Sequence, residues 1–180
     1  MPLRRSTVLA VACLAVFSAP AILVGQQPPQ VFSFDLDVPG GNYSEWALET
    51  PSGIAGVSAT IVFETLRPKS QWMPSFALMA GDPEGSVSVS FAQRVKNGPL
   101  IARLRRFSHG ELTDSKEFPG SYSPGDTVTF TLSWSSEGDA IATFEGVTLT
   151  GIHISPPQRV SIAVSSGQVK ASRLSYLPRD

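Results

Sequence analysis

Cysteine is almost absent from the chain, and this scarcity excludes several kinds of chemistry. The one cysteine is Cys13, in the N-terminal segment that we interpret below as a leader. A domain without this residue forms no disulfide, offers no thiolate to a metal and has no cysteine nucleophile. The two histidines, His109 and His153, leave little room for a conventional zinc site.

Charged residues are also scarce, at 16% of the chain against about 25% in a typical soluble protein. Without the two leader arginines, Arg4 and Arg5, 12 basic residues stand against 15 acidic ones, a net charge of -3. A mildly acidic surface does not attract nucleic acid or anionic lipid, so we expect no nucleic-acid partner. Hydrophobic residues still make up 42% of the 180 residues, enough for one domain with a sizeable core.

Residues 1–25 have the pattern of a secretory signal peptide. A positively charged start precedes an apolar run at residues 7–17, and the small residues of Ser18–Ala21 follow. We predict cleavage after Ala21 or after Gly25, and therefore a secreted or periplasmic protein. The alternative is an uncleaved anchor, because residues 7–25 are just long enough to span a bilayer. The membrane would be a partner only in that case.

Residues 26–30 (QQPPQ) form a short polar linker, and residues 31–180 read as one all-β domain. Apolar and polar residues alternate strictly along Asp126–Trp134, which is typical of a strand with one buried face. About ten segments are strand candidates, and none has the 3.6-residue period of a helix. Further candidates start near Phe32, Val57, Val87, Leu100, Ala140, Arg159 and Val169.

Proline or glycine stands at almost every break between these segments, for example at Pro39-Gly40-Gly41 and Pro124-Gly125. Short strands with turn residues at this spacing predict an antiparallel β-sandwich of two sheets. Phe76–Ala80 is nearly all apolar, which predicts a central strand covered on both faces.

The segment from Pro124 to Gly146 has a recognisable order of features. A strand ending in Trp134 is followed by a glycine loop, a second strand and a glycine turn, with further strands at residues 159–164 and 169–176. This pattern resembles the late hairpin of concanavalin A-like lectin and glucanase domains, which include the laminin G-like modules. The resemblance implies a jelly roll of two antiparallel sheets.

The glucanases of that family use a strand motif of the form E-x-D-x-E, and this chain has none. Asp35-Leu36-Asp37 comes nearest and lacks both glutamates. The resemblance and the missing motif together favour an exported, non-catalytic recognition module that binds carbohydrate or a cell-surface polymer. We therefore assign no catalytic residue, and whether the protein is an enzyme stays open.

Two alternatives remain from the sequence. The first is a structural or protein-interaction domain of an envelope or secreted assembly, which would show an exposed apolar patch or an open sheet edge. The second is a polysaccharide hydrolase or lyase, which needs two carboxylates about 5–10 Å apart across a cleft. The candidate carboxylates for that reaction are Asp35, Asp37, Glu45, Glu49 and Glu64.

Four residues are candidates for ligand binding. Trp46 and Trp72 are the tryptophans outside the clear alternating pattern, and an exposed indole stacks well on a sugar ring, whereas Trp134 is expected in the core. Arg103 and Arg105, with Arg106 and His109 nearby, form a basic cluster that could grip a carboxylate or sulfate of an acidic polysaccharide. The alternative for this cluster is a charged strand edge that prevents aggregation.

We predict no metal site and no other cofactor. Calcium could bind the loop acids Asp82, Glu84 and Asp139, or the pair Asp35 and Asp37, but the dense D-x-D-x-D-G spacing of a strong calcium motif is missing. Turn formation explains the three loop acids, and a solvated outer strand face explains the pair.

Overall fold

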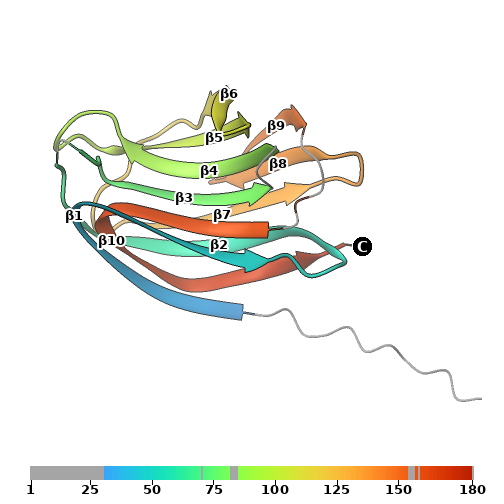
Figure 1. Cartoon of the computed structure of the whole chain (residues 1–180), viewed down its shortest axis with the longest axis horizontal. Helices are drawn as coiled ribbons and strands as arrows, with labels where there is room; N and C mark the ends of the chain where they lie inside the picture. The colour runs from blue at the N-terminus through green and yellow to red at the C-terminus, as the bar shows by residue number, and fades with distance from the viewer. Residues whose placement is uncertain (1–30, 70, 82–84, 154–156, 158, 180) are drawn as a thin grey trace, which may run out of the picture.

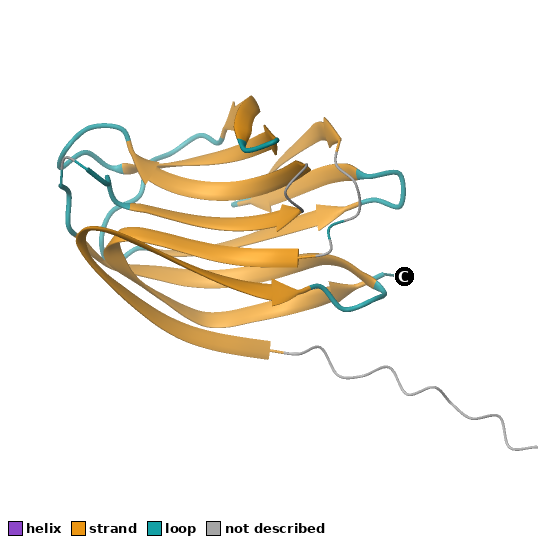
Figure 2. Ribbon diagram, viewed as in Figure 1, coloured by secondary structure: helices purple, strands orange, loops and turns teal. Residues whose placement is uncertain are grey.

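The computed structural model describes residues 31–69, 71–81, 85–153, 157 and 159–179. The predicted signal peptide and linker lie outside these residues, as do Asp82 and Glu84. All regular structure in the described part of the chain is β-strand (Figure 2). No helix that could cross a membrane is found among the described residues.

Ten strands make up the domain. They are β1 (Val31–Glu49), β2 (Ile54–Leu66), β3 (Ser75–Gly81), β4 (Gly85–Gln93), β5 (Leu100–Ser108), β6 (Glu111–Glu117), β7 (Thr127–Trp134), β8 (Asp139–Phe144), β9 (Val147–His153) and β10 (Arg159–Pro178). Every strand pairs antiparallel with its neighbours.

The strands form two layers that share β1 and β10 (Figure 1). Sheet I has the order β1, β10, β3, β4, β5, β6 and uses residues 43–49 of β1 and 159–165 of β10. Sheet II has the order β1, β10, β2, β7, β8, β9 and uses residues 31–38 and 167–178. The all-β, antiparallel, two-sheet sandwich predicted from the sequence is confirmed.

The two shared strands pass from one sheet to the other without ending. In β10 the change comes at Ser165-Ser166-Gly167, where Ser166 has a left-handed φ of 47°. In β1 it comes at a register shift between Val38 and Tyr43. The prediction of a turn at Pro39-Gly40-Gly41 is therefore wrong, because this segment lies inside β1 as an irregularity rather than between strands. The segments 159–164 and 169–176 are likewise one strand.

Aromatic rings fill the space between the sheets. Phe91 of β4 lies at the centre, with ring-centroid distances of 5.3 Å to Phe63, 5.6 Å to Phe130 and 5.5 Å to Phe144. All three partners come from sheet II, on β2, β7 and β8, so the ring packing joins the layers. Trp134 is 3% exposed, as expected from its place on the apolar face of β7.

The structure corrects the prediction for β3. Phe76, Leu78 and Ala80 enter the core, but Ala77 and Met79 lie on the opposite, outer face of sheet I and are half-buried. Only one face of this apolar strand therefore packs between the sheets. The other face provides part of the surface described next.

Candidate binding face

On the outer face of sheet I, mostly small side chains of β10, β3 and β4, with Met79 as the large exception, lie between the side chains of β1 and those of β5. Register places the following residues in successive cross-strand rows from β1 to β5: Tyr43, Ser165, Ser75, Ala92 and Ile101; Glu45, Ala163, Ala77, Ser90 and Arg103; Ala47, Ser161, Met79, Ser88 and Arg105. Neighbouring strands are about 4.8 Å apart, so β1 and β5 lie about 19 Å apart across this face. We call this surface the trough.

The floor of the trough lies low between its sides. Ser88, Ser90, Ser161 and Ala163 point away from the core, yet each is at most 5% exposed, because larger neighbours shield them. A hollow of about 60 Å³ opens on this face, lined by Glu45, Met79, Gly81, Ser86, Arg159 and Ser161. Small residues on three adjacent strands thus leave room for a ligand to approach the sheet itself.

Arginines form the β5 side of the trough. Arg103 Nε donates to Glu117 Oε2 of β6 at 3.2 Å, and Arg94 pairs with the same carboxylate. Arg105 lies in the next cross-strand row after Arg103, between Ser88 of β4 and Ser115 of β6. Burial, and then the charges of Arg103 and Arg94, lower the pKa of Arg105 from its ordinary value.

Two exposed aromatic rings stack at one corner of the trough. Tyr43 of β1 and Trp72 of the β2–β3 connection have ring centroids 5.6 Å apart and planes inclined by 29°. They are 45% and 44% exposed, so the stacked pair faces solvent. Stacked aromatic rings with an exposed face are well suited to packing against the C–H surface of a sugar.

The bend in β10 holds Trp72 in place. Ser166 Oγ donates to the carbonyl oxygen of Trp72 at 2.6 Å and accepts from the backbone N–H of Gly41 at 2.9 Å. Ser165 Oγ donates to the carbonyl oxygen of Met73 at 2.6 Å. These bonds connect β1, the β2–β3 connection and β10 at the point where the sheets meet.

Tyr43 is also linked to the acid beside it. Its hydroxyl donates to Glu45 Oε2 at 2.8 Å. Burial, followed by this hydrogen bond and the Glu45 charge, raises the pKa of Tyr43 to about 12. The phenol therefore stays neutral near pH 7, and its orientation is fixed by Glu45.

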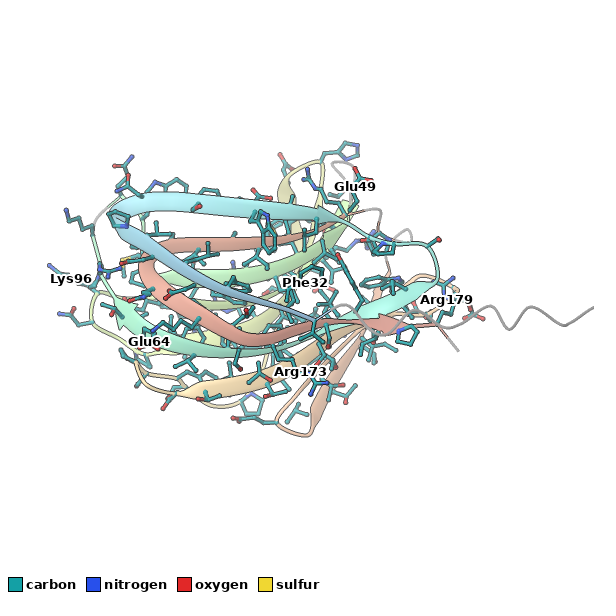
Figure 3. All side chains as sticks on the ribbon, turned by 90° about the horizontal axis from the view of Figure 1, so that it is seen from below. Phe32, Glu49, Glu64, Lys96, Arg173 and Arg179 are labelled. Carbon is teal, nitrogen blue, oxygen red and sulfur yellow. The ribbon has the colours of Figure 1, made fainter. Side chains whose placement is uncertain are left out.

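A second hollow lies at one end of the sandwich. It has a volume of about 400 Å³ and is lined by Leu66, Pro68, Gln93, Asn97, Gly98, Pro99, Ser123 and Pro124. The connections β2–β3 and β4–β5 meet at this end (Figure 1). Figure 3 shows Lys96 at this end and Arg179 at the other. Gln93 Nε2 donates to the Gly98 carbonyl oxygen at 2.6 Å and holds the loop, whereas Gln93 Oε1 is buried and has no hydrogen-bond partner among the described residues.

The structure brings together three of the four predicted binding residues. Arg103 and Arg105 lie on one side of the trough and Trp72 at its corner, whereas Trp46 pairs with the core residue Ile162 and so lies on the other face of β1. Trp46 is nevertheless 39% exposed, because β1 is an edge strand of sheet I.

The predicted basic cluster is divided by strand alternation. Arg106 faces the side opposite Arg105, and His109 lies in the β5–β6 turn with a φ of 51°. Sequence reasoning also missed Tyr43 and the serine floor. The available signal was the run of serines at positions 86, 88 and 90, which marks a polar strand face but not what that face does.

The carboxylates proposed for a hydrolase do not gather in one cleft. Asp35, Asp37 and Glu64 belong to sheet II, where Lys170 and Arg67 are their ion-pair partners. Glu45 and Glu49 belong to sheet I, four residues apart on β1, or about 13 Å along the strand. Asp35 and Glu64 approach each other through Lys170, which lies 3.9 Å from Asp35 Oδ2 and 3.2 Å from Glu64 Oε1. Neither acid lines one of the two hollows of the described residues, so this pair does not face the cleft that the hydrolase alternative requires.

Within the described ranges, no three His, Cys, Asp or Glu side chains are grouped so that they could hold a metal ion. Asp139 is at the start of β8, and its backbone N–H donates to Ser135 Oγ at 3.0 Å, which is a turn contact. Asp35 Oδ1 accepts from Gln168 Nε2 at 2.9 Å on a strand face.

Comparison with known proteins finds likeness in structure only. No protein-family model matches the chain, and no curated protein matches it significantly in sequence. The galectin LEC-6 of Caenorhabditis elegans superposes with a TM-score of 0.51 at 13% identity, over 79% of this chain and 95% of the galectin. The homodimeric agglutinin CG-16 from chicken liver gives 0.53 at 10% identity, over 74% and 100%.

A bacterial module gives a similar result. The carbohydrate-binding module CBM66 of Bacillus subtilis superposes with a TM-score of 0.50 at 9% identity, over 76% of this chain and 81% of the module. Structural likeness at identities this low shows a shared fold and nothing more. The chain is a jelly-roll β-sandwich of the kind found in galectins, and the resemblance to concanavalin A-like lectin domains is confirmed for the fold.

Proposed function

We propose that the domain is a non-catalytic, lectin-like module that binds carbohydrate in the trough. The observation that carries this proposal is the exposed stack of Tyr43 and Trp72 beside a floor of small, polar residues. The stack provides an apolar surface for a sugar ring, and the serines and arginines provide hydrogen-bond partners for its hydroxyls.

The similar structures support this proposal independently of the residues. Two of them are named a galectin and an agglutinin, and the third a carbohydrate-binding module. A shared fold does not by itself determine function, so the proposal depends on the trough and not on the likeness alone.

A binding experiment with matched tryptophan variants tests the proposal. Purified domain is screened against a glycan array, and affinities for the best ligands are measured by calorimetry. Trp72→Ala should weaken binding about tenfold, the value of one aromatic contact. Trp46→Ala removes a similarly exposed indole from the other face of β1 and should change affinity less than twofold.

Two results would contradict the proposal. The first is an array on which the wild-type domain binds no glycan, which would favour the alternative of a structural or protein-interaction domain. The second is a loss of affinity in Trp46→Ala that equals the loss in Trp72→Ala, since the ligand would then not lie in the trough. Circular dichroism of each variant shows that the loss is not caused by unfolding.

We further propose that the protein is exported, as the sequence of residues 1–25 predicts. The ligand would then be a glycan or polymer outside the cytoplasm, such as a component of the cell envelope. N-terminal sequencing of protein recovered from the medium or the periplasm should read from Ile22 or Gln26. Recovery of full-length protein in the cytoplasm would contradict export.

A further inference from the structure

The guanidinium of Arg105 lacks a partner on the outer face of sheet I. In the part of the chain that the structure describes, it makes no hydrogen bond and no ion pair, and its Nε is buried without an acceptor. A guanidinium offers five N–H donors in a fixed plane. Leaving donors of a half-buried cation unpaired costs free energy, so the site favours an acceptor brought by a ligand.

Positive charge is in excess around Arg105. Arg94 and Arg103 lie close enough to lower its pKa, and both pair with the single carboxylate of Glu117. Three cations and one anion leave two positive charges on this side of the trough. Because Arg103 has only 13% of its side chain exposed, its charge is poorly screened by water.

The cross-strand row of Arg103 also contains a buried hydroxyl without a hydrogen-bond partner in the described part of the chain. Ser90 lies directly across from Arg103 on β4, is 4% exposed, and has no hydrogen-bond partner for Oγ within the described residues. A hydroxyl can donate to an anionic oxygen, and the neighbouring row places Ser88 and Ser115 beside Arg105. An anion here would find both charge and donors.

From this cluster we infer that the trough binds an acidic glycan, with a carboxylate or sulfate group of the sugar seated at Arg105 and Arg103. This inference rests on the proposed function, because it names the class of carbohydrate that the trough takes. Guanidinium donors bind oxyanions in pairs, which gives the acidic group a fixed position relative to the Tyr43–Trp72 stack.

Two pairs of polymers distinguish whether the bound group is a carboxylate or a sulfate. Methyl esterification of polygalacturonate removes its carboxylate charge, and chondroitin sulfate differs from chondroitin by its sulfate groups, while both chondroitins keep their uronate carboxylates. Each is titrated into the full domain by calorimetry at two salt concentrations. We expect binding of at least one acidic polymer to exceed that of its less charged partner by at least tenfold, and this preference to weaken at high salt.

Variants of Arg105 and Arg173 test whether the preference for the acidic polymer arises in the trough. Arg105→Gln keeps a hydrogen-bond donor but removes the charge, and should reduce the affinity for the acidic polymer about tenfold, which lowers the preference. Arg105→Lys should retain part of it. Arg173, labelled in Figure 3, lies opposite Thr60 in the strand register on the outer face of sheet II. Arg173→Gln removes the same charge there and should leave the preference unchanged.

Failure of this inference differs from failure of the proposed function. If wild-type domain binds both members of each pair equally, or if Arg105→Gln keeps the full preference, the inference is wrong while carbohydrate binding stands. If none of the four polymers is bound although the glycan array yields a ligand, the inference is wrong and carbohydrate binding stands, whereas the proposed function itself is wrong if the array also yields none. If Arg173→Gln loses as much preference as Arg105→Gln, net charge and not the trough is responsible.

Discussion

At the scale of single residues, the three tyrosines report most directly on the environment that the fold creates. Burial is the largest cause of a raised pKa in Tyr43, Tyr122 and Tyr176. Tyr43 and Tyr122 also donate to a carboxylate, Glu45 and Glu145 respectively, which holds the proton on the phenol. For Tyr43 and Tyr122 the pKa is raised to about 12.

These shifts predict a loss of stability at high pH. The folded protein keeps the phenolic protons up to about pH 12, whereas the unfolded chain releases them near 10.0. The stabilisation is therefore complete below pH 10 and disappears as pH rises toward 12. Tyrosinate absorbance should show no titration in native protein near pH 10. In Glu45→Gln the titration of one tyrosine should begin at lower pH, and an unchanged titration would contradict the Tyr43–Glu45 contact.

At the scale of the elements, alternation in the sequence predicted the strands that have one buried face. It failed for β6, whose sequence ELTDSKE has no apolar side because the strand lies at the sheet edge with nearly every residue exposed. It also did not identify β9 as a strand. The alternation also predicted that β1 and β10 would each end at Gly or Ser residues, whereas in the structure these residues bend the strand and it continues. Local sequence cannot distinguish a bend that continues into another sheet from a turn that ends a strand.

The bend of β10 makes a prediction of its own. Ser166→Ala keeps the left-handed backbone but leaves the Gly41 N–H and the Trp72 carbonyl without Ser166 Oγ, which is fully buried. We expect the free energy of unfolding to fall by about 1–3 kcal/mol in urea denaturation. Glycan affinity should fall as well, because Trp72 loses its anchor. Unchanged affinity would show that this bond does not position Trp72.

The floor of the trough gives a second test at this scale. Ala77→Leu adds bulk to the outer face of β3, where Ala163 and Ser90 are its cross-strand neighbours. Because Ala77 is half-buried, the added bulk should cost about 1–3 kcal/mol, and urea denaturation of the variant should show that the fold persists. Calorimetry should show at least a tenfold loss of glycan affinity. A variant that binds normally would place the ligand elsewhere, and Ser123→Tyr, which narrows the end hollow, serves as the matched control.

At the scale of the whole molecule, the core joins the two sheets through Phe91 and the rings around it. Phe91→Ala removes five ring contacts, to Phe63, Phe76, Tyr122, Phe130 and Phe144. We expect a loss of about 3–5 kcal/mol in the free energy of unfolding, measured by urea denaturation. A loss below about 1 kcal/mol would show that the sheets do not depend on this cluster.

The binding face is also a property of the whole molecule, which explains why the sequence predicted only part of it. Trp72, Arg103 and Arg105 were identified as residue types that bind sugars and anions. Tyr43 was not, because its partner Trp72 lies 29 positions away and meets it only where β1 changes sheets. The serine floor likewise gains its meaning from register across β10, β3 and β4, which no local pattern contains.

The most direct test of carbohydrate binding in the trough is an NMR titration of isotope-labelled domain with the glycan selected by the array. Binding there predicts chemical-shift changes concentrated at Ser88, Ser90, Ala163 and the Trp72 indole, all near the outer face of sheet I. Changes concentrated instead on the Thr60–Thr129 face of sheet II, or around Pro99 and Pro124 at the end of the sandwich, would contradict it.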